Sequence, residues 1–151
     1  MSHGQHHADE SEWALKLFVV LSRASRAVTD RVKEDIKNHG LNPTEFAVLE
    51  LLFHKGDQPI QHIGKKILLS SGSMTYVIDR LEEKDLLRRK PSPDDRRMTY
   101  ATITSEGYAT MEKIFPAHEE AIRNLFSELD LGEKRTLIDL LKKVGYSAEG
   151  S

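Results

Sequence analysis

The stretch KPSPDDRRMTYATIT, Lys90 to Thr104, decides the fold that we predict for this chain. Seven of its residues, PSPDDRR, hold two prolines, two aspartates and two arginines, and an alternation of apolar and polar residues follows. Prolines and aspartates favour turns, whereas MTYATI and the preceding LLRRK are typical of short strands. The sequence therefore predicts a β-hairpin whose tip carries the prolines, the aspartates and the arginines.

Helical patterns precede this hairpin. Apolar residues between Trp13 and Ile36 recur at three- and four-residue intervals, which predicts one amphipathic helix from about Ser11 to His39. Residues 1–10 are polar and rich in histidine, and we expect them to form a disordered tail. The segment NPTEF, residues 42–46, combines a capping box with proline at the first helical position, and it starts a second helix that ends at Gly56. A short helix over residues 60–67 is expected next.

A further helix is predicted in LSSGSMTYVIDRLEEKDLL, residues 69–87, with Ser70 as its cap. Its apolar residues fall on one helical stripe, which holds Met74, Val77, Ile78 and Leu81. The opposite face is small and hydrogen-bonding, with few long charged side chains, and it holds Ser71, Ser73, Thr75, Tyr76, Asp79 and Arg80.

Two helices are predicted after the hairpin. Thr104 caps the first, which runs to about Glu128, and a capping box at Asp130 starts the second, which runs to Gly145. Three short helices followed by a hairpin make a winged helix-turn-helix, in which the last of the three helices enters the DNA major groove. The predicted fold class is therefore mainly α with a small β-hairpin.

Composition agrees with a protein that binds DNA through a local surface. The chain has 151 residues and a net charge of −2, but residues 60–103 hold nine Lys/Arg against six Asp/Glu. Local basic character matters more than net charge when a protein meets phosphates. Because no apolar run is long enough to span a membrane and no signal peptide is recognisable, we expect a cytoplasmic protein with no membrane partner.

The chain contains no cysteine, which excludes disulfides, thiolate zinc sites and cysteine nucleophiles. Any response to a quinone or a peroxide must then come from reversible binding or from methionine oxidation. Seven histidines raise the question of a metal, but His118, Glu119 and Glu120 are adjacent on a helix and do not share a face. Neither a metal nor a cofactor is expected, and the absence of nucleotide-binding and hydrolase motifs argues against an enzyme.

The segments LNPTEFAVLELL and IGKKILLSSGSMTYVIDRLEEKDLLRRKPSPDDRRMTYATITSEG resemble the MarR family of bacterial transcriptional regulators, from about Leu41 to Gly107. The most specific part is PSPDDRR followed by alternating residues and TSEG. Two positions depart from the family pattern, because the family usually has glycine where this chain has Asp85 and commonly has alanine where it has Gly64. The resemblance implies a DNA-binding lobe over residues 41–104, with dimerisation helices over 11–39 and 105–146.

DNA-binding residues are expected in two places. On the recognition helix, hydroxyls, a glycine and the helix N-terminus suit phosphates and base edges, in Ser71, Gly72, Ser73, Thr75, Tyr76 and Arg80. An ordinary polar surface is the alternative there, and Arg80 is close enough to neighbouring acids to pair with them. At the wing tip the expected residues are Asp95, Arg96 and Arg97. Candidate contacts to the DNA backbone are Lys65 and Lys66 of the short helix and Arg88, Arg89 and Lys90 of the hairpin, and for each of these five a solvated side chain is the alternative. The family resemblance implies that Asp95 holds Arg97 while Arg97 enters the minor groove.

The resemblance also implies partners other than DNA. It implies a symmetric homodimer built from the terminal helices, whose operator is an inverted repeat, and a small aromatic or phenolic effector bound between those helices and the DNA-binding lobe. Candidate effector-binding residues are Phe18, His39, Phe46, Tyr108, Met111 and Phe115, although such residues are often only core. The expected function is a ligand-responsive repressor, and the alternative is a winged-helix module that binds a ligand or a protein without specific DNA binding.

Overall fold

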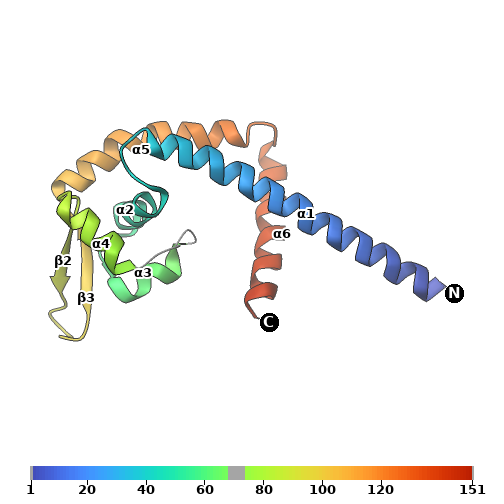
Figure 1. Cartoon of the computed structure of the whole chain (residues 1–151), viewed down its shortest axis with the longest axis horizontal. Helices are drawn as coiled ribbons and strands as arrows, with labels where there is room; N and C mark the ends of the chain where they lie inside the picture. Colours follow the sequence, from blue (N-terminus) through green and yellow to red (C-terminus); the bar gives the residue numbers. More distant parts are fainter. Residues whose placement is uncertain (1, 68–73, 151) are drawn as a thin grey trace. The chain divides into compact units, whose positions relative to one another are not determined.

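A computed structural model describes residues 2–67 and 74–150 (Figure 1). The chain forms two compact units, which meet in sequence between His118 and Glu119. In chain order the elements are α1 (Ser2–Lys37), α2 (Pro43–Lys55), β1 (Gln58–Pro59), α3 (Ile60–Lys66), α4 (Met74–Glu83), β2 (Leu87–Pro91), β3 (Thr99–Ile103), α5 (Ser105–Leu125) and α6 (Leu131–Glu149). No helix among the described residues is long and apolar enough to cross a membrane.

The start of α2 is built as its sequence predicts. The Asn42 side chain accepts a hydrogen bond from the Glu45 backbone N–H at 2.7 Å, and the Glu45 carboxylate accepts one from the Asn42 N–H at 3.0 Å. Pro43 occupies the first turn, where its missing N–H costs nothing. The helix ends at Gly56, whose φ of 79° lies in the left-handed region that favours glycine.

The core of the first unit surrounds α2, which contacts α1, α4 and β3 (Figure 1). Its apolar residues come from α1, from α2, α3 and α4, from the hairpin and from α5. The least exposed large side chains are Ile36, Leu49, Leu52, Ile63, Ile78, Leu81, Leu87 and Met111. Burial of each such side chain stabilises the fold by about 1.5–3 kcal/mol. The hairpin and α4 are therefore held by one common core.

The predicted hairpin is confirmed. Strands β2 and β3 pair antiparallel, with Leu87 opposite Ile103 and Pro91 opposite Thr99. The short strand β1 adds to the other side of β3, which gives the order β1-β3-β2. The sequence analysis missed β1, because a two-residue strand that includes a proline carries no alternating pattern.

Helix α4 buries the expected stripe and exposes the expected face. Val77, Ile78 and Leu81 are buried and Met74 is half-buried, whereas the described members of the opposite face, Thr75, Tyr76, Asp79 and Arg80, are exposed. The predicted capping residue Ser70 lies outside the described residues. After the helix, Asp85 has a φ of 61°, so it takes the left-handed conformation at the position where the family usually has glycine.

The first turn of α5 packs closely against the end of the α4–β2 turn. Thr104 accepts a hydrogen bond on its Oγ1 from the Gly107 N–H at 2.9 Å and donates one from Oγ1 to the Asp85 carbonyl at 2.6 Å. A Cβ atom at Gly107 would lie 2.1 Å from the Leu86 carbonyl oxygen. The TSEG sequence thus supplies both a cap and a close backbone contact.

Gly107→Ala should therefore destabilise the protein by about 2 kcal/mol, because the new methyl group meets a backbone carbonyl that cannot move freely. Thermal or denaturant unfolding measures the change. Gly64→Ala is the matched control, since a Cβ there meets nothing within 4 Å. Without a clash, alanine in a helix should stabilise by about 0.5–1 kcal/mol. Equal effects of the two substitutions would contradict the close contact.

The terminal helices differ from the sequence prediction in length. Helix α1 begins at Ser2, so residues 2–10 are helical here rather than a disordered tail. Helix α5 ends at Leu125, close to the expected end at Glu128. Helix α6 begins with the predicted capping box at Asp130 but continues through Gly145 to Glu149. Gly145 does not end the helix, because a glycine in a helix interior destabilises it by only about 1 kcal/mol relative to alanine and the flanking turns compensate this cost.

Both terminal helices present large apolar side chains to solvent within their own units. On α1 these are Trp13, Leu15, Leu17, Phe18, Val19 and Val20. Helix α6 has no buried residue, and its exposed apolar side chains are Leu131, Leu137, Ile138, Leu140, Leu141, Val144 and Tyr146. Contiguous apolar surface of this extent is typical of an interface with another chain.

Candidate nucleic-acid interface

The outward face of α4 is the first part of the candidate interface. Thr75, Tyr76 and Arg80 are exposed, and the Tyr76 side chain is 63% exposed despite its aromatic ring. Among the described residues Arg80 forms no ion pair, so the pairing with acids that the sequence suggested is not observed for it. Ser71, Gly72 and Ser73 lie outside the described residues.

The tip of the wing, residues 92–98, is the second part, and it is held by its own polar side chains. The Ser92 hydroxyl accepts hydrogen bonds from the N–H groups of Asp94 at 3.3 Å and Asp95 at 3.2 Å. The Asp95 carboxylate accepts one from the Arg97 backbone N–H at 3.0 Å. Such side-chain turns replace backbone pairing and stiffen a loop.

This geometry refines the role expected for Asp95. Its carboxylate holds the backbone N–H of Arg97 rather than the guanidinium, and the arginine side chain is exposed to solvent. The Arg97 carbonyl also accepts a hydrogen bond from Gln61 Nε2 of α3 at 3.4 Å. The backbone at the tip is therefore fixed from two sides, whereas the charged end of Arg97 remains exposed.

Polar contacts also tie the remaining parts of the lobe together. Lys84, which follows α4, forms an ion pair of 2.8 Å with Glu45 at the start of α2, and the Glu45 side chain is only 4% exposed. Thr102 of β3 donates to the Asp57 carboxylate at 2.6 Å. These contacts link α4 and the wing to α2 and β1, so the two parts of the interface belong to one packed lobe.

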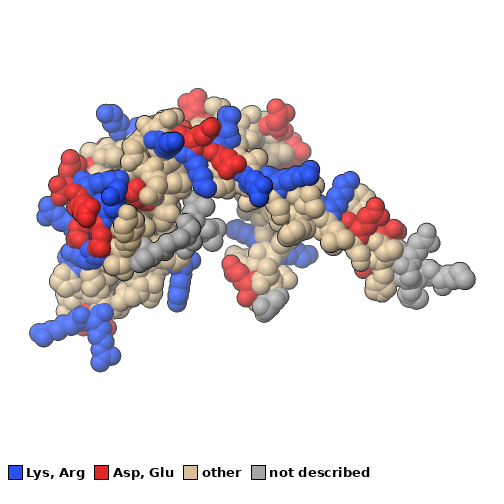
Figure 2. All heavy atoms as spheres, in the orientation of Figure 1, with Lys and Arg blue, Asp and Glu red and all other residues tan. Residues whose placement is uncertain are grey.

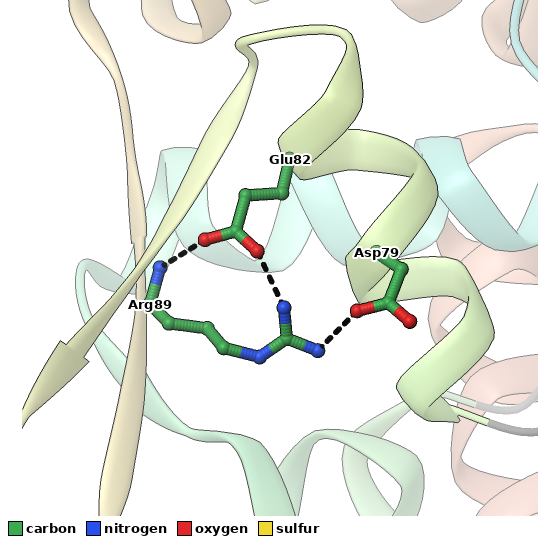
Figure 3. A network of polar contacts seen from close by, with 3 residues as sticks. All are labelled: Asp79, Glu82 and Arg89. Atoms are coloured by element: carbon green, nitrogen blue, oxygen red, sulfur yellow. Dashed lines mark hydrogen bonds and ion pairs between the residues drawn. The ribbon is translucent and has the colours of Figure 1, made fainter.

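The three basic residues of β2 occupy different environments. Arg88 and Lys90 are exposed, as a phosphate contact requires. Arg89 is half-buried, and its guanidinium pairs with Asp79 and Glu82 of α4 (Figure 3). The hydrogen bond with Asp79 is the main cause that raises the pKa of Arg89 above its ordinary value, against a smaller opposing effect of burial.

Charge on the visible face is unevenly distributed (Figure 2). Basic side chains extend beyond the tip of the wing, at the lower left, where Arg96 and Arg97 are both exposed. Over α4 and β2, acidic and basic side chains lie next to each other. Lys65 and Lys66 of α3, which the sequence analysis named as candidate DNA-backbone contacts, are both exposed. Lys66 donates a hydrogen bond from Nζ to Gln58 Oε1 at 2.5 Å. Among the described residues Arg96 and Arg97 form no ion pair, although Asp94 and Asp95 lie in the same turn.

The predicted effector residues fall into two groups. Phe46, Tyr108 and Phe115 join one aromatic cluster, in which Phe53 lies 4.8 Å from Tyr108 and 6.1 Å from Phe115 between ring centroids. Met111 belongs to the buried core. Phe18 is 69% exposed on α1, and His39 lies in the turn after that helix, so neither joins the cluster.

Sequence reasoning missed three members of this cluster, which are Phe53, His54 and His118. The His54 ring lies 4.8 Å from Phe115, and the His118 ring lies 4.6 Å from Phe46. Nδ1 of His118 and Oδ2 of Asp35 are 3.7 Å apart, and neither atom has a hydrogen-bond partner among the described residues. The described residues contain no group of three or more acids and histidines that could hold a metal ion.

Comparison with known proteins identifies the family. The MarR family model matches residues 41–99, which include α2, α3, the described α4 and most of the wing. The HTH-type transcriptional regulator MhqR of Bacillus subtilis is 55% identical over 139 residues, which cover 92% of this chain and 96% of MhqR. The chain belongs to the MarR family. The resemblance, the winged helix-turn-helix fold and the expected function as a transcriptional regulator are thereby confirmed, and the named relatives are regulators rather than enzymes.

Solved MarR-family structures have the same fold. Sco3205 of Streptomyces coelicolor, solved in complex with DNA, aligns with a TM-score of 0.79 at 20% identity and covers 87% of this chain and 84% of its own. BpsR of Bordetella bronchiseptica aligns with a TM-score of 0.74 at 26% identity and covers 86% of this chain and 98% of its own. The DNA binding of BpsR is regulated by 6-hydroxynicotinic acid.

Proposed function

We propose that this MarR-family chain is a homodimeric repressor that binds an inverted-repeat operator and releases it when a small aromatic effector binds. The observation that carries the proposal is the placement of the exposed α4 face and an arginine-tipped wing on one packed lobe. A ligand- or protein-binding module would need neither feature. MhqR, the 55% identical relative, is named as a transcriptional regulator, which favours DNA binding over that alternative.

In the proposed complex α4 lies in the major groove. Thr75, Tyr76 and Arg80 would then contact base edges and phosphates, together with Ser71, Gly72 and Ser73. Arg96 and Arg97 would reach the adjacent minor groove or backbone from the wing, and Arg88 and Lys90 would contact phosphates. Sco3205, which shares the fold, was solved with DNA. Such a regulator of chromosomal genes would work in the cytoplasm.

The homodimer follows from the exposed apolar faces of α1 and α6. Trp13 and Phe18 on α1 are more than half exposed, and α6 alone exposes seven large apolar side chains. A second copy of the chain would cover these faces in a two-fold interface. Two recognition helices related by that axis would meet half-sites about one DNA turn apart, which requires an inverted repeat.

The effector site is proposed at the aromatic cluster around Phe53. An aromatic ligand could stack on these rings, and the polar atoms of Asp35 and His118 that lack a hydrogen-bond partner among the described residues would recognise its hydroxyl or carboxyl group. BpsR, which is 26% identical, is regulated by an aromatic hydroxy acid. Because the chain lacks cysteine, release of DNA by such a compound should reverse on dialysis.

Selection from a random duplex library tests the proposal. The full-length protein should enrich one inverted repeat, and binding to that repeat should weaken steeply with salt, by a slope of about 0.9 per phosphate contact. Half of the repeat alone should bind far more weakly, since it engages one recognition helix. Enrichment of no sequence, or of a single asymmetric site, would contradict the proposed function.

A further inference from the structure

Arg89 of β2 joins the wing to the recognition helix. Its Nη2 lies 2.6 Å from Oδ1 of Asp79, and its Nη1 lies 2.5 Å from Oε1 of Glu82 (Figure 3). The two carboxylates come from α4, three residues apart and therefore on one face of that helix. One guanidinium thus bridges two carboxylates that lie about one turn apart on α4, the helix that faces DNA in the proposed complex.

The backbone of Arg89 takes part in the same network. The Arg89 N–H donates to Oε2 of Glu82 at 3.2 Å, so both carboxylate oxygens of Glu82 are engaged by one residue (Figure 3). Strand β2 is an edge strand, because the sheet order is β1-β3-β2. Edge strands leave backbone N–H groups without a neighbouring strand, and Glu82 accepts one of them. The network therefore fixes the strand itself as well as its side chain.

The neighbouring basic residues of β2 lack this arrangement. Side chains alternate along a strand, so Arg88 and Lys90 point to the opposite face from Arg89, and both are exposed. The Arg89 side chain is 31% exposed, whereas that of Asp79 is 52% and that of Glu82 is 38% exposed. If the guanidinium left to contact DNA, two carboxylates would be uncompensated beside the phosphates.

We propose that Arg89 is a positioning residue, which fixes the wing against the recognition helix and neutralises Asp79 and Glu82, and does not contact DNA itself. This inference rests on the proposed function and revises the sequence-based expectation that Arg89 contacts phosphate. The recognition helix and the wing must meet two grooves at once, so their relative position determines whether both contacts form together.

Arg89→Lys separates the two roles, because it keeps the positive charge but loses the planar fork that bridges two carboxylates. We expect operator affinity to fall about three- to tenfold, with the salt slope unchanged. A phosphate contact would be largely retained by lysine. Arg31→Lys on α1 is the matched control, because Arg31 is exposed and lies outside the proposed DNA-binding surface, and it should leave affinity unchanged.

Glu82→Gln gives an independent reading. It removes a negative charge near DNA, so simple electrostatics expects tighter binding, whereas loss of the clamp expects weaker binding. Glu83→Gln is its control, because Glu83 is the exposed neighbour on α4 and the Arg89 guanidinium is directed to Glu82 and Asp79 instead. We expect Glu82→Gln to weaken operator binding and Glu83→Gln to leave it equal or tighter.

Hydrogen exchange in the free protein makes the inference testable without an operator. The Arg89 N–H should exchange faster in Glu82→Ala, which removes both acceptor oxygens, than in Glu83→Ala, while core amides of α2 keep their protection and report intact folding. Wild-type affinity of Arg89→Lys together with tighter binding of Glu82→Gln would overturn the inference. Failure of the wild-type protein to bind any inverted repeat would instead overturn the proposed function, since the exchange result does not depend on DNA.

Discussion

The double variant Leu140→Glu/Val144→Glu should be monomeric and should lose tight operator binding. The two residues lie one turn apart on α6 and are 54% and 45% exposed within their own unit, so they can be replaced without opening its packing. In a dimer they would be buried. Burial of each apolar side chain of this size stabilises a dimer by about 1.5–3 kcal/mol, and each buried glutamate adds a desolvation cost. We therefore expect the dimer dissociation constant to rise at least about a thousandfold.

Sedimentation or light scattering measures the assembly, and titration with an inverted repeat measures the loss of two-site binding. Lys142→Glu is the matched control, because Lys142 lies about 200° around the helix from Leu140 and is also exposed. It should leave the protein dimeric. A double variant that stays dimeric would show that α6 does not provide the interface.

Local chemistry made much of the fold predictable from sequence. The capping boxes at Asn42 and Asp130 each satisfy two backbone donors with side chains three residues away, so their signals lie within one turn of chain. The hairpin is equally local, because its turn residues and its alternating strands are contiguous. The left-handed conformation of Asp85 was implied by the family resemblance, because the family usually has glycine at this position, and such a conformation is common at helix ends.

Contacts between distant elements were harder to predict. The sequence analysis considered that acids near Arg80 would pair with it, but Asp79 and Glu82 pair with Arg89, which is seven to ten residues away along the chain. Which arginine the acids pair with depends on how β2 packs against α4, and residue spacing in the sequence does not predict that packing. The sequence showed only that the two acids, spaced i and i+3, lie on one face of the helix.

The candidate effector site shows the same limit. Aromatic residues at helical spacing nominated Phe46, Tyr108 and Phe115, which the structure brings together. Phe53 and His118 were missed because their contacts cross from α2 to α5, over more than fifty residues for the nearest ring pairs. Phe18 was nominated by type alone, and its exposure instead supports a role in the proposed dimer interface.

Arg97→Ala should weaken operator binding by about 1–3 kcal/mol and lower the salt slope by about one unit, while the dimer remains intact. The reason is the fixed backbone at the wing tip, where Asp95 holds the Arg97 N–H and Gln61 holds its carbonyl. The exposed guanidinium loses less freedom when it enters a minor groove, and a groove narrowed by A·T pairs concentrates the negative potential that attracts it. Arg97→Lys should lose less, since it keeps the charge.

Two substitutions at Asp95 separate its charge from its hydrogen bond. Asp95→Asn keeps an oxygen that can accept from the Arg97 N–H and removes a negative charge near DNA, so operator binding should be equal or tighter. Asp95→Ala removes the same charge but also the acceptor, so the tip loosens and binding should weaken despite the more favourable electrostatics. Titration of both variants at several salt concentrations tests the difference. Equal tightening by alanine and asparagine would mean that Asp95 acts on DNA binding only through its charge, and that the wing tip needs no side-chain turn to present Arg97.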